Sequence, residues 1–385
     1  MKIVHLSADF PDPLHPGKTK AVSNLLSLAP RHEHRVYSLN RVTALNGFSA
    51  QSFGQGHRAV AYGALPKGLM LAGRMAALAD WIARDLRQAG VSPDAVHAHK
   101  LSVEALAGEP LAQRLGIPLI VTSQGNSDLK ILRARPDLRR RWQHVWQSAD
   151  RMLPFAPWTA EALEAILGPR DGPIQCLPCP TTADNIIAPR MAPPRLLTVF
   201  GLDEWSNKRV DFLIEAVRII RSGGVPVELD IAGTGSATSF ARLDAKVNQM
   251  PFVRLIGHVR HDRIQILMNR AAILVVPSRR ESFGMVFAES LLAGCPVIHG
   301  AENGPSGYFP GAPFAVPAPR REPDTLARTI LRMLQGQAPI KAALTAAQRQ
   351  GDLDFLTRAS IGRHYDAILS SLASGSEPQV TDQAA

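Results

Sequence analysis

Two glutamates, Glu281 and Glu289, stand eight residues apart just after a short apolar run. That run, 273–276, is rich in β-branched residues and is closed by Pro277, which predicts a buried parallel strand. We expect a helix over 286–292, with Glu281 in the strand-to-helix loop and Glu289 about a turn inside the helix. The two carboxylates can then both face the carboxyl edge of the sheet, on the order of 10 Å apart.

The residues between the two carboxylates are suited to holding an anion. The N–H groups of Phe283, Gly284 and Met285 lie at the expected helix start, where they have no partner inside the helix and the helix dipole is positive. A diphosphate fits such a start, and the flanking carboxylates can accept hydrogen bonds from sugar hydroxyls. This combination favours a nucleotide-sugar site. The alternative is that Glu281 only caps the helix and Glu289 is a solvated helix residue.

Length and composition favour a globular enzyme of two domains. The chain has 385 residues with 45% hydrophobic and 20% charged residues. No apolar run approaches the roughly 20 residues of a membrane helix, and residues 1–6 indicate a first strand, not a signal peptide. Three cysteines cannot all pair, and the Cys176–Cys179 spacing lacks the second ligand pair of a zinc site. We therefore expect a cytoplasmic protein.

Strands and helices alternate along the chain in two series. In the first series we expect strands at 2–7, 35–39, 59–62, 94–99 and 119–123, with helices near 20–29 and 69–89. After a proline-rich joint at 188–194, the second series has strands at 196–200, 227–232, 253–256, 273–276 and 296–298. This alternation predicts an α/β fold of two Rossmann-like halves with parallel sheets and right-handed crossovers. In such folds ligands bind at the carboxyl edges of the strands, here in a cleft between the two halves.

The second half resembles the retaining glycosyltransferases of family 4, whose GT-B fold has two facing Rossmann-like domains. Residues 281–289 match the E-x7-E signature of that family, and the other matching segments are 196–202, 207–216, 230–235, 255–259, 276–278 and 293–298. The first half matches loosely, through the glycine of its first loop and the segment 96–99. The resemblance implies an N-terminal acceptor-side domain over 1–187 and a C-terminal donor domain over 188–353. A final helix near 354–372 is expected to pack back on the first domain, and the polar tail 374–385 to be disordered.

The resemblance also implies which residues take part in the reaction. Glu281 would contact the donor sugar, Lys208 would hold the diphosphate, and Glu289 would hold the ribose hydroxyls. Gln124 stands where the family often has a histidine near the sugar. A glutamine can hydrogen-bond a sugar hydroxyl but cannot exchange protons near pH 7.

Further residues are implied for the donor and the acceptor. The implied donor-binding residues, besides Glu289, are Phe283, Gly284, Met285 and Val286 at the helix start, Gly257, His258 and Val259 beside the nucleobase, and Gly17, Gly201, Arg209, Ser278 and Arg279 near the diphosphate. The family often has an arginine directly after the position of Gly201, and this chain does not, so one cation for the diphosphate is lost unless Arg209, Arg279 or Arg280 replaces it. The acceptor is expected to meet Lys18, Thr19, Asn126 and Asp128.

The resemblance implies a retaining hexosyltransferase that uses a nucleoside diphosphate sugar and needs no cofactor or metal. UDP is the first candidate for the nucleotide, with GDP and ADP open. The acceptor would be a hydroxyl of a glycan, such as a lipid-linked or envelope polysaccharide. The alternative is a non-catalytic nucleotide-sugar-binding or assembly scaffold on the same fold.

The chain is basic, with a formal net charge of +10, and much of the excess lies in the stretch 130–146. Its second part predicts a helix with Leu138, Trp142, Val145 and Trp146 on one stripe. That helix either packs its apolar stripe on the core or makes a peripheral contact with an anionic leaflet at the inner face of the membrane. Nucleic acid is not an expected partner, because no recognition motif accompanies the charge.

Overall fold

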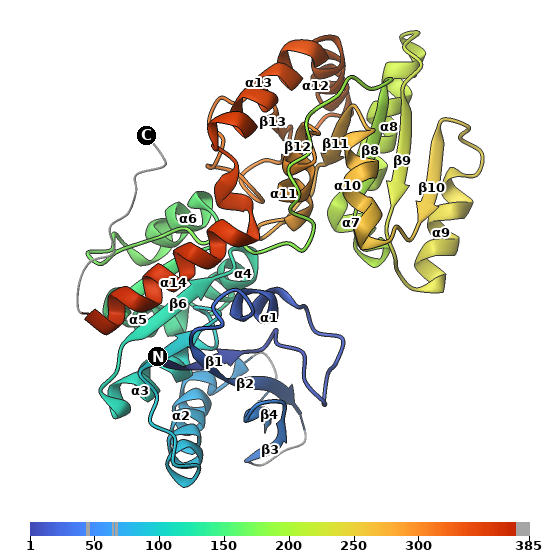
Figure 1. Ribbon diagram of the computed structural model, residues 1–385. Helices are drawn as coiled ribbons and strands as arrows, with labels where there is room; N and C mark the ends of the chain where they lie inside the picture. The colour runs from blue at the N-terminus through green and yellow to red at the C-terminus, as the bar shows by residue number, and fades with distance from the viewer. Residues whose placement is uncertain (44–46, 64, 66–67, 375–385) are drawn as a thin grey trace. The chain divides into compact units, whose positions relative to one another are not determined.

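The computed structural model describes residues 1–43, 47–63, 65 and 68–374, which form two compact α/β units (Figure 1). Unit 1 contains Met1–Pro180 and the described residues from Ala359 on, and unit 2 contains Thr181–Arg358. The segment 181–187 therefore belongs to unit 2, where the backbone N–H of Asn185 donates to Gln265 Oε1 at 3.2 Å.

Unit 1 is built on a seven-stranded sheet, as far as the described residues show, in the order β3-β4-β2-β1-β5-β6-β7. Its strands are β1 (Lys2–Ser7), β2 (Glu33–Val42), β3 (Phe48–Phe53), β4 (His57–Gly63), β5 (Ala95–Ala98), β6 (Leu119–Ser123) and β7 (Arg151–Pro154). All pairs are parallel except β3 with β4. The direction of winding changes between β1 and β5, and ligand sites in open α/β sheets lie at such points.

The helices of unit 1 cover this sheet with their apolar sides. They are α1 (Ala21–Leu26), α2 (Leu71–Gln88), α3 (Ala105–Leu115), α4 (Asn126–Ala134), α5 (Arg139–Ser148), α6 (Pro157–Leu167) and α14 (Arg358–Ser374). The last helix, α14, buries Ile361, Tyr365 and Ile368 in one cluster with Ile3 and Ile120 of the sheet (Figure 1). The C-terminal helix is thus held in unit 1 by apolar burial.

Unit 2 is built on a parallel sheet in the order β10-β9-β8-β11-β12-β13. Its strands are β8 (Arg195–Val199), β9 (Glu228–Ala232), β10 (Val253–Gly257), β11 (Ile273–Val276), β12 (Val297–Gly300) and β13 (Ala315–Ala318). The winding changes direction between β8 and β11, so the loops that follow these two strands emerge side by side at the carboxyl edge. Those loops carry Gly201, Lys208 and Glu281.

The helices of unit 2 enclose its core. They are α7 (Trp205–Lys208), α8 (Val210–Ser222), α9 (Ala237–Val247), α10 (His261–Asn269), α11 (Met285–Leu292), α12 (Pro323–Gln335) and α13 (Gln337–Gln350). Apolar side chains recur every three or four residues in α8 and α12, and both helices bury that side in one cluster with the strands of the sheet.

Each strand that the sequence predicts is confirmed, and three strands were not predicted. β3 is mostly exposed and lacks the apolar alternation of a half-buried strand. β7 and β13 have only four residues each, and Pro317 lies inside β13, a position that proline takes only in edge strands. The helix expected near 354–372 is a 3₁₀ turn at Asp354–Leu356 followed by α14. Apart from Ser374, the predicted disordered tail lies outside the described residues.

Candidate active site

The loop between β11 and α11 places Glu281 and Glu289 as the sequence predicts. β11 ends at Val276, Glu281 lies in the loop, and Glu289 lies in the second turn of α11. The backbone of the loop is held from the segment after β12, because the N–H of Gly304 donates to the carbonyl of Glu281 at 3.0 Å. The position of Glu281 is therefore set by the backbone of two neighbouring strand ends.

The carboxylate of Glu281 forms an ion pair with the ammonium of Lys208, and both side chains are about five-sixths buried. Lys208 is the last residue of α7, in the loop after β8. The two loops are joined by their backbones as well, since the N–H of Arg279 donates to the carbonyl of Asn207 at 2.8 Å and Asn207 Nδ2 donates to the carbonyl of Arg280 at 3.0 Å. The structure thus brings together the two residues that the sequence assigned to the sugar and the diphosphate.

Glu289 is buried and holds a hydrogen bond from the hydroxyl of Thr181. Burial raises the pKa of the Glu289 carboxyl, while the Thr181 hydroxyl and the charge of His261 oppose that rise. The group is thus a carboxyl that already accepts from one hydroxyl. Thr181 was missed by sequence reasoning, because it precedes the proline-rich joint in an irregular segment that no motif marks.

The start of α11 requires the glycine that precedes it. Gly284 has φ of 74°, and a Cβ there would lie 2.6 Å from the ring of Phe287 and 2.9 Å from Glu281 Cγ. Phe283 is buried, whereas Met285 is exposed and Val286 is half-buried. Because Met285 and Val286 open the helix, their N–H groups have no intrahelical partner and remain available to an anion.

Two arginines lie near the Lys208–Glu281 pair. Arg209 has φ of 57°, and its guanidinium lies 3.6 Å from the ring centroid of Phe212 and donates to the carbonyl of Pro319 at 3.3 Å. Burial and, to a lesser extent, the charge of Arg279 lower the pKa of Arg209. A diphosphate would relieve this repulsion between like charges.

The remaining donor residues lie at neighbouring strand ends of unit 2. Gly257 ends β10 with φ of 75°, His258 after it is exposed, and Val259 is half-buried. Gly201 follows β8 and is exposed. Ser278 is buried, and its hydroxyl lies 3.5 Å from Glu281 Oε2.

Asn303 is a further residue that sequence reasoning missed. Its amide Nδ2 donates to the carbonyl of Ser278 at 3.3 Å and to that of Arg279 at 3.4 Å, so it holds the β11–α11 loop from the β12 side. Gly300 allows this approach, because a Cβ there would lie 2.2 Å from the carbonyl oxygen of Ser278. The sequence signal for Asn303 is weak, since it stands in a turn rich in glycine and serine.

In unit 1, two residues predicted to meet the acceptor are engaged inside the protein. The ammonium of Lys18 donates to Asp12 Oδ2 at 2.8 Å, Ser38 Oγ at 2.9 Å and Leu39 O at 3.3 Å, which uses its three donors. Asp128 is fully buried and accepts from the hydroxyl of Ser123 and from two backbone N–H groups. The side chains of Lys18 and Asp128 thus stabilise loops next to the sheet through hydrogen bonds within the protein.

The other predicted residues of unit 1 lie close in sequence to Lys18 and Asp128. Gln124 directly follows β6 and is 9% exposed, and Asn126 is the first residue of α4. Gly17 and Thr19 are exposed, and the Thr19 hydroxyl accepts from the N–H of Ala21 at 3.3 Å. A Cβ at Gly17 would meet no atom within 4 Å.

Unit 1 has an acid–base cluster at the carboxyl edge of its sheet that was not predicted. Lys100 Nζ lies 2.7 Å from Asp9 Oδ2, and the N–H of Ala8 donates to Glu104 Oε1 at 2.9 Å. The other oxygen of Glu104 has no hydrogen-bond partner among the described residues. Burial raises the pKa of Glu104 to about 7, although the charge of Lys100 opposes it.

The basic stretch 130–146 packs its apolar stripe inward, which confirms the first of the two interpretations for the stripe. Trp142 and Trp146 are buried, and their indole N–H groups donate to the carbonyls of Ser102 and Gly168 at 3.2 and 3.1 Å. The three consecutive arginines at 139–141 are exposed. Within the described part of the chain, no helix is long and apolar enough to cross a membrane.

Comparison with known families and structures gives consistent matches over most of the chain. Residues 193–336 match the model described as "Glycosyl transferases group 1", and residues 20–180 match the "Glycosyl transferase 4-like domain". The glycogen synthase of Mycobacterium tuberculosis (strain H37Rv) is 26% identical over 277 residues, which cover 68% of this chain and 65% of that enzyme. The chain thus spans slightly less than two thirds of that relative.

Solved structures resemble nearly the whole chain. Sucrose-phosphate synthase from Thermosynechococcus elongatus has a TM-score of 0.71 at 16% identity, over 98% of this chain and 100% of that one. The HepE protein of Anabaena, solved in complex with UDP, has a TM-score of 0.62 at 14% identity, over 96% and 100%. At these identities the likeness establishes the fold alone.

Proposed function

Since the chain belongs to the family 4-like glycosyltransferases of the GT-B fold, we propose that it transfers a hexose from a nucleoside diphosphate sugar to an acceptor hydroxyl, with retention of configuration and without a metal at the reacting centre. The observation that carries this proposal is the buried Lys208–Glu281 pair beside the open start of α11. This pair offers a cation for the departing diphosphate and a carboxylate for the sugar hydroxyls, from two adjoining loops of unit 2.

The donor would bind along the carboxyl edge of unit 2. Lys208 and the N–H groups of Met285 and Val286 would hold the diphosphate, with Arg209 or Arg279 adding the second cation. Glu289, already hydrogen-bonded to Thr181, would accept from the ribose hydroxyls. UDP is our first candidate for the nucleotide, supported by the UDP that the related Anabaena structure holds, and GDP and ADP remain open.

Transfer would proceed by displacement on one face of the sugar. The bond from the anomeric carbon to the diphosphate oxygen breaks, the bond to the acceptor oxygen forms on the same face, and the acceptor proton passes to the leaving diphosphate. Lys208 stabilises the charge that develops on the leaving group. Gln124 can orient a hydroxyl as donor and acceptor, and this route does not need a histidine at that place.

The acceptor would be a glycan, lipid-linked or part of an envelope polysaccharide, and would contact residues of unit 1. The apolar stripe of α5 is buried, so a contact with anionic lipid at the inner face of the membrane would rest on the exposed arginines at 139–141 alone, at about 1 kcal/mol for each charge. Changing Arg139, Arg140 and Arg141 together to Ser should weaken sedimentation with anionic vesicles, while sedimentation with neutral vesicles stays the same. Unchanged binding to anionic vesicles would remove the membrane part of the proposal.

A scaffold that binds a nucleotide sugar without turnover is the second candidate. Gln124 and the absence of an arginine beside Gly201 are the observations that favour it. A scaffold has no need of a cation buried against Glu281, which favours the enzyme.

The test is a panel of UDP, GDP and ADP sugars, followed by thermal shift and by NMR of the product, with and without EDTA. A ligand that binds only the folded chain raises the melting temperature. One nucleotide should give a shift that Glu289→Gln abolishes, and its sugar should be transferred with its anomeric configuration kept. Binding without turnover of any donor, to any glycan acceptor tried, would favour the scaffold.

A further inference from the structure

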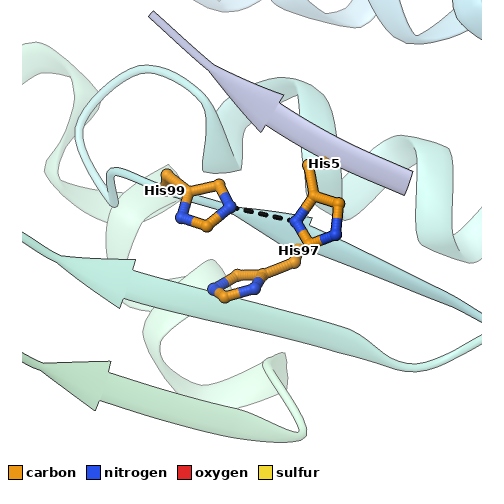
Figure 2. A group of neighbouring side chains, drawn as sticks. All are labelled: His5, His97 and His99. Atoms are coloured by element: carbon orange, nitrogen blue, oxygen red, sulfur yellow. Dashed lines mark hydrogen bonds between the residues drawn. The ribbon is translucent and has the colours of Figure 1, made fainter. Parts of the chain in front are cut away.

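Three buried histidines lie together on one side of the sheet of unit 1 (Figure 2). His5 on β1 and His97 on β5 are register partners, and His99 directly follows β5, two residues after His97. None of the three rings is more than 2% exposed. We name His5, His97 and His99 the histidine cluster; the proposed transfer makes no use of it.

Hydrogen bonds determine which nitrogen of His5 carries its proton. His34 Nε2 must donate to the carbonyl of Ala29 at 2.9 Å, because a carbonyl only accepts. His34 Nδ1 therefore accepts from His5 Nε2, also at 2.9 Å. The lone pair of His5 is thus on Nδ1, and it faces His99 Nε2 at 3.0 Å (Figure 2).

Burial keeps these rings in the form that binds metals. It lowers the pKa of His5 and of His97 well below the usual value and lowers that of His99 to about 3, and the neighbouring histidines add to the effect. The three imidazoles are therefore neutral at physiological pH, each with one nitrogen lone pair.

The ligand atoms are close to the spacing that a metal ion requires. One nitrogen from each ring lies within 4.8 Å of the other two. Around a tetrahedral zinc ion with Zn–N bonds of about 2.1 Å, two ligand nitrogens lie about 3.4 Å apart. The His5–His99 separation of 3.0 Å already approaches this value, so a modest movement of the His97 ring completes the set.

The outer groups that orient metal-binding histidines are also present. His5 donates its other N–H to His34. His97 has a hydroxyl on each side, Tyr365 at 2.9 Å from Nδ1 and Thr122 at 2.8 Å from Nε2, so one partner remains whichever nitrogen binds. Such partners fix the ring orientation and raise the basicity of the ligand.

We propose that the histidine cluster binds one Zn²⁺ ion, which stabilises unit 1. Three imidazoles without a carboxylate suit zinc and not the oxygen-preferring Mg²⁺ or Ca²⁺. On binding, the proton of His99 moves from Nε2 to Nδ1, so the ring stays neutral and no proton is released. The ion joins β1 to β5 and, where Nε2 of His97 is the ligand, the bond of its Nδ1 to Tyr365 connects both strands to α14. It plays no part in transfer, for which the proposed donor residues lie in unit 2.

The test is metal binding by the full chain after exhaustive dialysis against a chelator. Zn²⁺ should bind with a stoichiometry of one per chain and raise the melting temperature. X-ray absorption at the zinc edge should show a nitrogen and oxygen shell with imidazole scattering. No stoichiometric binding, before or after refolding in the presence of Zn²⁺, overturns the proposal, as does a sulfur ligand from Cys176 or Cys179.

The Zn²⁺ affinities of single-residue variants test whether the ion binds at the histidine cluster. His99→Gln should lower the affinity for Zn²⁺ at least 100-fold, and His34→Gln about 10- to 100-fold through loss of the outer partner. The matched controls His144→Gln, an exposed histidine of α5, and Cys176→Ser should bind as the parent does. Unchanged affinity in His99→Gln contradicts the proposal. If that variant does not fold, the absorption spectrum of the parent decides, because it needs no substitution.

Discussion

The charged residues that were predicted to meet a substrate are held differently in the two units. In unit 2, the Lys208–Glu281 pair stands beside a helix start whose N–H groups have no intrahelical partner, so the pair can add a ligand to its contacts. In unit 1, the donors of Lys18 all have partners within the protein, and Asp128 accepts three hydrogen bonds there. A charged residue at the carboxyl edge of a sheet can therefore bind a ligand only where donors or acceptors around it have no partner within the protein.

The largest effect is expected from removing the cation in unit 2. Lys208→Ala should lower kcat/KM about 10²- to 10³-fold and weaken UDP more than UMP, because the ammonium is assigned to the diphosphate. Steady-state kinetics and calorimetry measure both. Lys246→Ala is the matched control, since Lys246 pairs with Asp211 on the surface of the same unit. Equal losses of kcat/KM in the two variants would contradict the assignment of Lys208 to the donor site.

The next effect concerns the buried acid of unit 1. Glu104 has a folded pKa of about 7, above its ordinary value, so the folded state keeps the proton while the unfolded state has lost it. The carboxyl therefore destabilises unit 1 progressively as pH rises from about 5 to 7, by on the order of 3 kcal/mol. Glu104→Gln should remove this dependence, as measured by urea denaturation at pH 5 and 7.5. Glu161→Gln, an exposed control, should follow the parent; a Glu104→Gln variant that also follows it contradicts the assignment.

A pair of glycines compares the two loops directly. Gly284→Ala should destabilise unit 2 by about 2 kcal/mol and impair donor binding, because the residue has positive φ and its Cβ would press on Phe287 and Glu281. Gly17→Ala in unit 1 should be nearly neutral in stability, because its Cβ meets open space. Thermal melts and nucleotide titrations check both. A tolerated alanine at 284 would show that the tight turn is not required.

The smallest effect is expected at Lys18. Burial alone would raise the pKa of Asp12, but hydrogen bonds from Lys18, Ser38 and Asn40 lower it to about 2. The paired carboxylate therefore stabilises unit 1 above pH 4, and this contribution is lost as pH falls towards 2. Lys18→Met should destabilise by about 1 to 2 kcal/mol at pH 7 and by less at pH 3, with Lys20→Met as the exposed control. A Lys18→Met variant that loses activity at unchanged stability would instead support the prediction that Lys18 contacts the acceptor.

The sequence predicted unit 2 more completely than unit 1 for a physical reason. The strand, turn and helix around 281–289 form one contiguous segment, so spacing alone places both carboxylates. The family resemblance assigned Lys208 to the diphosphate, but its ion pair with Glu281 was not predicted, because 73 residues separate the partners. Thr181 and Asn303 act through side-chain hydrogen bonds from irregular segments, for which no periodicity exists.

In unit 1 the polar residues can be read from the sequence, but the residues that they contact cannot be predicted from it. Glu104 and the histidine cluster depend on which strands become neighbours, and β1 and β5 are more than 80 residues apart. The edge strand β3 was missed because it is mostly exposed and strand patterns reflect burial, and β7 and β13 were missed because they have only four residues each. Periodicity predicts elements, whereas the pairing of distant polar groups requires the fold.

The most direct test of the account is the turnover of Glu281→Gln with the donor that binds the parent. Glu215→Gln is the matched control, because Glu215 forms an exposed pair with Arg218 in the same unit. The account predicts a loss of about 10²- to 10³-fold in kcat/KM for Glu281→Gln, with its melting temperature kept, and parental activity for Glu215→Gln. Full turnover by a folded Glu281→Gln variant would contradict the central claim that this carboxylate contacts the transferred sugar.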